Sequence, residues 1–172
     1  MQPAEGASIS GTPSVRLSYE FADGWKFLRV ALKDAAARKI EGEPRAFGIW
    51  VHGDGNGGTP GIRVRDATGQ VHQVRGEPIS WKGWRYVTFP LRPAPDSGQT
   101  MIPLPDCRLF DQKDGAAYFV SGAEQRVSWE HWGGANDGEV HQPIEWDALF
   151  LLDGNRRANK GEIYLSAPTL VY

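Results

Sequence analysis

The segment from residue 129 to residue 137, WEHWGGAND, gathers side chains that could bind a flat polar ligand. It contains two indoles, an imidazole, two carboxylates and an amide, and its glycines allow close approach of the backbone. An indole packs against the C–H face of a pyranose, while carboxylates and amides bond the ring hydroxyls. We therefore predict a sugar-binding loop, unless Trp129 is a core residue and the loop is merely exposed. The candidate binding residues are Trp129, His131, Trp132, Asn136 and Asp137.

A second set of candidates lies earlier in the chain. Trp25 and Phe27 fall on the polar side of an alternating segment, residues 25–32, which is unfavourable unless something covers them. Arg63 and Arg65 alternate with apolar residues in the same way. If both segments share a sheet face, Trp25, Arg63 and Arg65 would line an aromatic cleft with guanidinium donors, suited to an oligosaccharide. The alternatives are that this face docks onto a neighbouring domain, or that the arginines pair with acidic residues in solvent.

Catalytic residue types are present, but their spacing is unspecific. A glycosidase needs two carboxylates across the scissile bond, and Glu130 with Asp137, or Glu139 with Glu145, could be drawn into one cleft. A lyase could be assembled from Tyr118, Arg126 and His131. We expect a non-catalytic module, and a small lyase or hydrolase is the weakest alternative.

Length and charge narrow the classes of partner. A chain of 172 residues fits one domain that buries a core without disulfides or metals. Its 19 Lys and Arg against 21 Asp and Glu leave a net charge of -2, which disfavours a nucleic-acid partner. No apolar run approaches the length of a bilayer span, so we expect no membrane partner. The four histidines and Cys107 show no metal-ligand spacing, so we expect no zinc site. Asp54 with Asn56, or Asp153 with Asn155, could supply oxygen ligands to a metal ion, but such residues in turns more often form turn hydrogen bonds.

Short alternating segments predict an all-β fold. Residues 46–91 alone indicate four strands separated by turns, and the glycine-rich turn at 53–58 is expected to close a hairpin. This density favours an antiparallel β-sandwich over helical or βαβ designs. Further strands are expected over residues 15–21, 25–32, 118–120, 126–132, 144–152 and 163–172.

The remaining segments are expected to be less regular. Residues 1–14 are rich in Gly, Pro and Ser and are predicted to form a linker, which leaves residues 15–172 as a single sandwich domain. Residues 33–39, KDAAARK, are the only good helix-forming run and are predicted to cross between sheets. Four prolines over residues 92–116 exclude a central strand and predict a long loop.

Seven tryptophans are unusual for this length. Trp84 and Trp81 lie beside apolar strand residues and are expected to pack in the structure. Trp50 alternates with Ile49 and Val51, so it faces the other way and is either a packing residue or a binding platform.

Three segments carry a resemblance to a known family. Residues 50–55 (WVHGDG), 65–70 (RDATGQ) and 79–85 (ISWKGWR) resemble the WVxGDGSG, RDxxGQ and IDWxGWR motifs of galactose-binding-like β-jelly-roll domains. The closing segment, residues 161–172, resembles the last strand of these domains, commonly GxIYIDDIxVxY. The resemblance covers most of the chain from Val15 onward and implies a jelly roll.

This resemblance also implies a function. Such domains occur as carbohydrate-binding modules and accessory domains of bacterial glycoside hydrolases and related secreted enzymes. The implied partners are a polysaccharide or oligosaccharide and the catalytic domain of a larger protein, with an extracellular or periplasmic location. The alternative is a structural accessory domain that packs on that catalytic neighbour. These domains often hold a structural calcium ion through an aspartate in the last strand, but Ser166 and Ala167 stand there in this chain, so we expect no cofactor.

Overall fold

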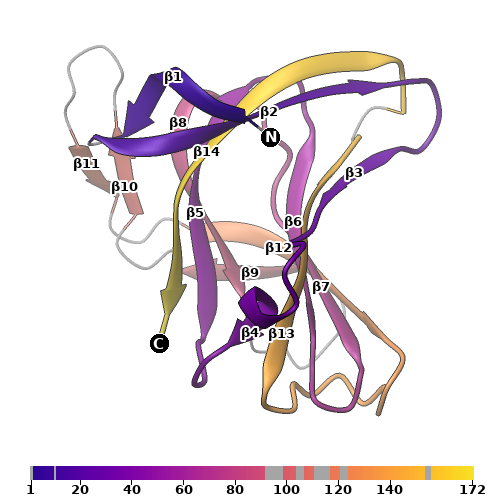
Figure 1. Cartoon of the computed structure of the whole chain (residues 1–172). Coiled ribbons are helices and arrows are strands. Elements are labelled where there is room, and N and C mark those ends of the chain that lie inside the picture. Colours follow the sequence, from indigo (N-terminus) through magenta and orange to yellow (C-terminus); the bar gives the residue numbers. More distant parts are fainter. Residues whose placement is uncertain are drawn as a thin grey trace.

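The strands of the chain form two main antiparallel sheets that pack face to face as a β-sandwich, which confirms the predicted all-β class (Figure 1). The computed structural model describes residues 2–9, 11–91, 99–103, 107–110, 117–120, 124–153 and 156–172, with side chains over residues 11–91, 127–153 and 156–172. The jelly-roll connectivity that the resemblance implies stays a prediction. Within the described ranges no helix is long and apolar enough to cross a membrane.

Five strands form the first sheet and seven form the second. The first sheet has the order β1 (Gln2–Ile9), β2 (Thr12–Phe21), β14 (Asn159–Val171), β5 (Ala46–Asp54) and β8 (Lys82–Pro90). The second has the order β3 (Phe27–Val30), β13 (Ile144–Leu152), β6 (Thr59–Arg65), β7 (Val71–Arg75), β12 (Glu124–Trp132) and β9 (Gln99–Pro103), and β4 (Lys39–Ile40) also pairs with β13. A separate ribbon joins β10 (Cys107–Phe110) to β11 (Ala117–Val120).

The core lies between the two sheets because apolar residues alternate along each strand. In β2, Leu17 and Tyr19 are buried while Ser18 is exposed, and in β6 both Ile62 and Val64 have no exposed surface. Side chains from both inner faces merge into one cluster. Burial at this density supplies the main stabilising free energy of a sandwich.

One connection differs from the expected one. The glycine-rich turn after β5 leads to β6, but these strands belong to different sheets, so the turn carries the chain across the sandwich and the predicted hairpin at 53–58 is wrong. Positive φ values at Gly55 and Gly57 allow this crossing. The next turn, at Asp66–Gly69, does close a hairpin between β6 and β7.

Three segments with a weak sequence pattern differ from the structure predicted for them. Residues 1–14 were expected as a linker, but β1 and the start of β2 pair there. The predicted helix over residues 33–39 is reduced to one 3-10 turn, η1 (Ala36–Arg38), because so short a run forms no stable α-helix alone. Residues 92–116 were expected as a loop, yet β9 and β10 form inside them. β9 is the edge strand of its sheet, so the prediction that the prolines exclude a central strand agrees with its position.

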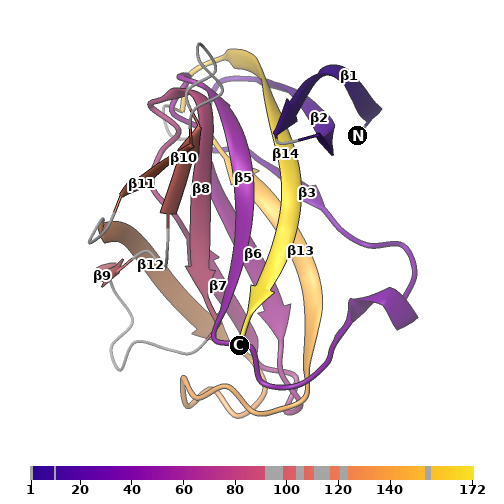
Figure 2. The same ribbon diagram turned by 90° about the vertical axis from the view of Figure 1, so that its left-hand side faces the viewer.

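The outer face of the five-stranded sheet carries its own aromatic layer. Trp84 is buried as predicted, and it packs with Trp50, Tyr86 and Tyr164 in a cluster separate from the main core. Figure 2 shows β5 lying between β14 and β8, the strands that supply these rings. Trp50 is only 9% exposed, so it is a packing residue and not a binding platform.

Both ends of the chain lie in this sheet. β2 and β14 pair antiparallel from Phe21 opposite Asn159 to Ser14 opposite Ser166, so the first residues of β2 lie beside the later part of β14. β14 then pairs with β5 on its other side. The closing strand therefore holds the sheet together in the middle.

A substitution at Leu151 tests how much the core between the sheets contributes to the unfolding free energy. It is 1% exposed on the inner face of β13, so Leu151→Ala should lower the unfolding free energy by about 2–5 kcal/mol. Urea unfolding at neutral pH measures this change. Leu32→Ala is the control, since Leu32 is 43% exposed and should lose much less. Equal losses in the two variants would contradict this description of the core.

Candidate functional site

A cleft on the outer face of the seven-stranded sheet is the strongest candidate site. It has a volume of about 260 Å³ and opens to solvent. Two of the seven tryptophans line it, and these are the two that are most exposed, Trp25 at 57% and Trp132 at 41%. The lining residues are Trp25, Phe27, Arg63, Gln73, Arg75, Glu130, Trp132, Phe150 and Leu152.

Strand alternation sets which side chains reach this cleft. In β12, Glu130 and Trp132 face outward, whereas Trp129 faces the core with 3% exposure. In β7, His72 and Val74 have no exposed surface and Gln73 takes the outward position. Because successive residues of a strand point to opposite faces, the neighbouring residues of the WEHW motif cannot all meet one ligand.

Pairing register then places polar side chains in a row across the sheet. Arg63 of β6 lies opposite Gln73 of β7, and Gln73 lies opposite Glu130 of β12. Arg63 Nη2 donates to Gln73 Oε1 at 2.6 Å, and Gln73 Nε2 donates to Glu130 Oε2 at 3.0 Å. Arg75 forms an ion pair with Glu130 at one end. We call these four side chains, Arg63, Gln73, Arg75 and Glu130, the polar row.

Asp147 continues the row toward β3. Its carboxylate accepts a hydrogen bond from Arg29 Nη2 at 2.6 Å and lies 3.8 Å from Arg63 Nη1. Burial lowers the pKa of Arg63, while the charge of Asp147 opposes that effect. The guanidinium is therefore held between a carboxylate and an amide, with its orientation fixed from both sides.

Aromatic rings flank the polar row. The Trp25 and Phe27 rings lie 5.2 Å apart at an interplanar angle of 49°. Across the row, the guanidinium carbon of Arg63 lies 5.1 Å from the centre of the Trp132 ring, within range of a cation–π interaction. Two exposed aromatic surfaces and a row of planar polar groups thus share one cleft.

A glycine makes room for the floor of the cleft. Gly61 of β6 lies opposite Phe150 of β13, and Phe150 is 3% exposed. A Cβ at position 61 would overlap the Phe150 ring and the carbonyl oxygen of Val74. The absence of a side chain at Gly61 therefore lets the Phe150 ring lie over the backbone of β6 beneath the cleft.

The structure brings together three of the eight predicted site residues: Trp25, Arg63 and Trp132. Trp129 is a core residue, which was the alternative interpretation, and His131 faces inward beside Gly138. Arg65 shares the outer face but does not line the cleft, because its Nη1 donates to the carbonyl of Gly69 at 3.1 Å.

Asn136 and Asp137 also lie apart from the cleft, in a loop that is fastened to the β6–β7 turn. Asp137 Oδ1 accepts a hydrogen bond from Gln70 Nε2 at 3.3 Å, and its Oδ2 lies 2.9 Å from His141 Nε2. Asn136 has a φ of 53°, a left-handed conformation that asparagine tolerates in turns. Asp137 is therefore engaged within the loop, and Asn136 occupies one of its left-handed turn positions.

Sequence reasoning missed Gln73, Arg75, Phe150 and Leu152. It noted Glu130 as a carboxylate of the segment 129–137 and as one member of a possible catalytic pair, but did not include it among the candidate binding residues. A stricter use of alternation would have found Glu130, since it has the same parity as Trp132 in its strand. The residues of β7 gave no such signal, because its short segment, VHQVR, is flanked by turns on both sides.

The loop is anchored on a buried carboxylate. Asp66 Oδ1 accepts hydrogen bonds from the backbone N–H groups of Thr68 and Gln70, both at 2.9 Å, and Oδ2 accepts one from the N–H of His141 at 3.2 Å. Burial alone would raise the pKa of Asp66, but the hydrogen bond from the Thr68 hydroxyl at 2.8 Å, together with those from the N–H of His141, the His72 ring and the N–H of Thr68, lowers it. His72 Nε2 lies 3.4 Å from Asp66 Oδ2, and the His72 side chain is completely buried. We call Asp66, Gln70 and His72 the buried anchor.

Among the described residues, no group of three or more His, Cys, Asp or Glu side chains is arranged so that it could hold a metal ion. Asp54 was a possible oxygen ligand, but its Oδ2 accepts hydrogen bonds from the hydroxyl of Tyr19 at 2.6 Å and the N–H of Glu162 at 3.1 Å. Burial, followed by the hydrogen bond to Asp54, raises the pKa of Tyr19. Asp54 thus ties β5 to β2 and β14. Asn155 lies outside the described residues.

Titration of His72 should make the fold sensitive to acid. Burial lowers the pKa of His72 below its ordinary value of about 6.5. Protons therefore bind the unfolded chain more readily, and the unfolding free energy should fall as the pH drops below about 6.5 toward the lower folded-state pKa. Urea unfolding between pH 7 and pH 5 should show this loss in the wild type and a reduced loss in His72→Gln.

His141→Gln is the control for that experiment. The hydrogen bond to Asp137 raises the pKa of His141, so this exposed residue acts in the opposite sense and its removal should preserve the loss. An identical pH dependence in the wild type and His72→Gln would show that the buried anchor does not titrate as described.

Comparisons with known proteins identify no family, relative or similar structure for this chain. No protein-family model matches the chain, no curated protein matches it, and no solved structure matches it.

Proposed function

We propose that the chain is a non-catalytic carbohydrate-binding domain whose ligand occupies the cleft on the outer face of the seven-stranded sheet. The single observation that supports this most is the meeting of the two exposed indoles, Trp25 and Trp132, in one cleft with a row of charged and amide groups. The domain would hold a secreted carbohydrate-active enzyme on its polysaccharide.

The chemistry of the cleft fits a saccharide in two ways. The exposed rings of Trp25, Phe27 and Trp132 offer apolar faces for the C–H side of sugar rings. The polar row offers a guanidinium, an amide and a carboxylate whose planes are already held by one another, so ordering them on binding costs little entropy. Stacking and hydrogen bonding can therefore act on one ligand from the same sheet face.

The composition of the cleft favours binding over hydrolysis. Glycoside hydrolysis uses two carboxylates placed on either side of the scissile bond. Glu130 is the one carboxylate among the described residues that line the cleft, and it is paired with Arg75 and accepts a hydrogen bond from Gln73. We infer that Glu130 serves recognition.

Substitution of the two exposed tryptophans tests the proposal. Isothermal titration calorimetry against a panel of neutral and acidic oligosaccharides should find at least one ligand. Trp132→Ala and Trp25→Ala should each weaken its binding by about tenfold or more, because truncating a central aromatic contact costs about 2 kcal/mol.

Tyr172→Ala is the matched control. Tyr172 is 58% exposed but lies outside the cleft, so its removal should leave the affinity unchanged. The proposed function would be refuted if the wild type bound no glycan of the panel, or if the Trp25→Ala, Trp132→Ala double variant kept the wild-type affinity.

The same exposed rings carry the alternative of a structural accessory domain. If Trp25, Phe27 and Trp132 covered a protein neighbour, the isolated chain would expose an apolar surface that favours self-association. Sedimentation velocity separates the two functions. A carbohydrate-binding domain should remain monomeric, whereas concentration-dependent dimers that Trp132→Ala abolishes, together with silence on the glycan panel, would favour the accessory role.

A further inference from the structure

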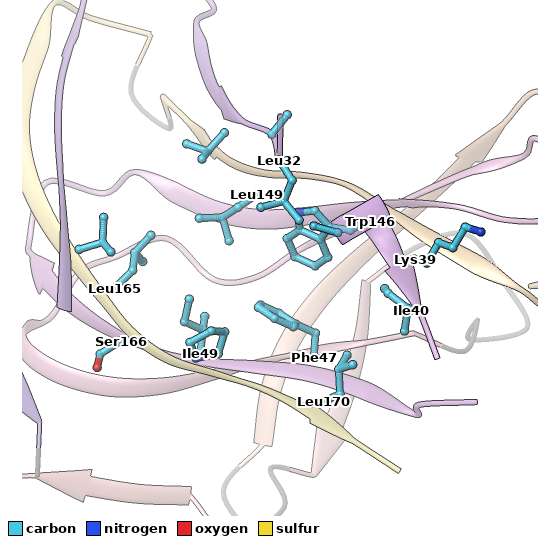
Figure 3. A pocket seen from close by; sticks show the side chains of 15 residues that line it. Leu32, Lys39, Ile40, Phe47, Ile49, Trp146, Leu149, Leu165, Ser166 and Leu170 are labelled. Atoms are coloured by element: carbon cyan, nitrogen blue, oxygen red, sulfur yellow. The ribbon is translucent and has the colours of Figure 1, made fainter. Parts of the chain in front are cut away.

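A second pocket lies between the two sheets at their open side. Its volume is about 410 Å³, within the range of small-molecule sites. Figure 3 shows Trp146 and Leu149 of β13 on one side and Phe47 and Ile49 of β5 facing them. The Phe47 and Trp146 rings lie 4.8 Å apart, so aromatic packing joins the two sheets at the wall of the pocket.

Backbone irregularities keep this side of the sandwich open. The pairing of β14 with β5 shifts between Ser166 and Thr169, where Ala167 has a φ of 48° and Pro168 cannot donate a ladder hydrogen bond. The chain also leaves the second sheet after Val30 and rejoins it only at Lys39. Each layer therefore departs from regular pairing beside the pocket, and the two layers do not close on each other.

The mouth of the pocket is braced by its own chain. Arg38 donates from Nε and Nη2 to the carbonyl of Leu32, at 3.0 Å and 2.8 Å, which fixes the loop that leaves the sheet. Leu32 is 43% exposed at this mouth. The opening is therefore held in place by hydrogen bonds within the chain itself.

The lining is almost entirely carbon. The hydroxyl of Ser166 is engaged, since it donates to the carbonyl of Pro13 at 3.1 Å. Lys39 stands at the rim beside Ile40 and, among the described residues, makes no ion pair, although Glu145 is its register partner. The pocket thus combines an apolar interior with one positive charge at the edge.

We propose that this pocket binds a linear aliphatic carboxylic acid, with the chain between the sheets and the carboxylate at Lys39. Two sheets about 10 Å apart leave a slot that suits an extended chain better than a globular group. An apolar ligand would restore the contacts that the facing side chains lack across the gap, which is the source of its affinity. The lysine ammonium supplies charge complementarity at the mouth. This inference does not rest on the outer-face cleft.

Titration of the whole chain with dodecanoate tests the proposal. Calorimetry should show one site in the wild type, and Ala37→Trp, which fills the mouth from an exposed position on η1, should weaken binding by about tenfold or more. Lys39→Met should weaken dodecanoate binding by about threefold and leave dodecanol binding unchanged, since an exposed charge pair contributes little. Lys33→Met, an exposed lysine outside the pocket, should change neither.

Fluorescence locates the ligand independently of the blocking variant. Dodecanoate brominated at the carbon next to its carboxylate should quench tryptophan emission of the wild type, and the quenched fraction should fall in Trp146→Phe, because Trp146 follows Glu145, the register partner of Lys39. Absence of dodecanoate binding, equal quenching in Trp146→Phe, or unchanged affinity in a folded Ala37→Trp would each overturn the proposal. Equal affinity of the wild type for dodecanol and dodecanoate would overturn the role of Lys39. Loss of glycan binding in the outer-face variants bears on the proposed function alone.

Discussion

The pairing register of β6, β7 and β12 is the constraint on which the rest of this structure depends. It sets Arg63, Gln73 and Glu130 side by side across three strands, and the same register sends His72 and Trp129 into the core. A shift of one residue would exchange the two faces of a strand, burying charges and exposing the core. The outer cleft and the hydrophobic interior are thus two results of one set of backbone hydrogen bonds.

Most of the fold could be predicted from alternation, because a strand with one buried face shows its period in the sequence. Tyr19 and Phe21, or Ile62 and Val64, are examples. The partner sheet of each strand could not be predicted in this way. The turn after β5 has the composition of a hairpin, but glycines allow a crossing between layers as readily as a reversal, and only long-range packing decides between them. The first strand could not be predicted for the same reason, because its sequence pattern is weak and β1 forms by pairing with β2.

The candidate site could be predicted only in part, again because the sequence does not show which residues meet in space. Residue types identified Trp25, Arg63 and Trp132 as unusual on strand faces, and the structure brings these three together. The WEHW motif misled because closeness in sequence is not closeness in space within a strand, where Trp129 and Trp132 lie on opposite faces of the sheet. Asn136 and Asp137 resembled ligand groups, yet the hydrogen bonds of Asp137 and the left-handed backbone conformation of Asn136 serve the loop itself. Polar residues in turns have this double use, and sequence alone does not separate them.

The hairpin of β1 and β2 at the edge of the first sheet has a mechanical consequence. Gln2 lies opposite Arg16 at the open end of this ladder and Ile9 lies opposite Thr12 beside the turn, so tension on the N-terminal end would load the interstrand bonds one after another, as in opening a zipper. Bonds broken in succession resist far less force than bonds sheared together. The sandwich would therefore yield to pulling at this end by opening its edge hairpin first, before the sheet that carries the aromatic cleft is strained.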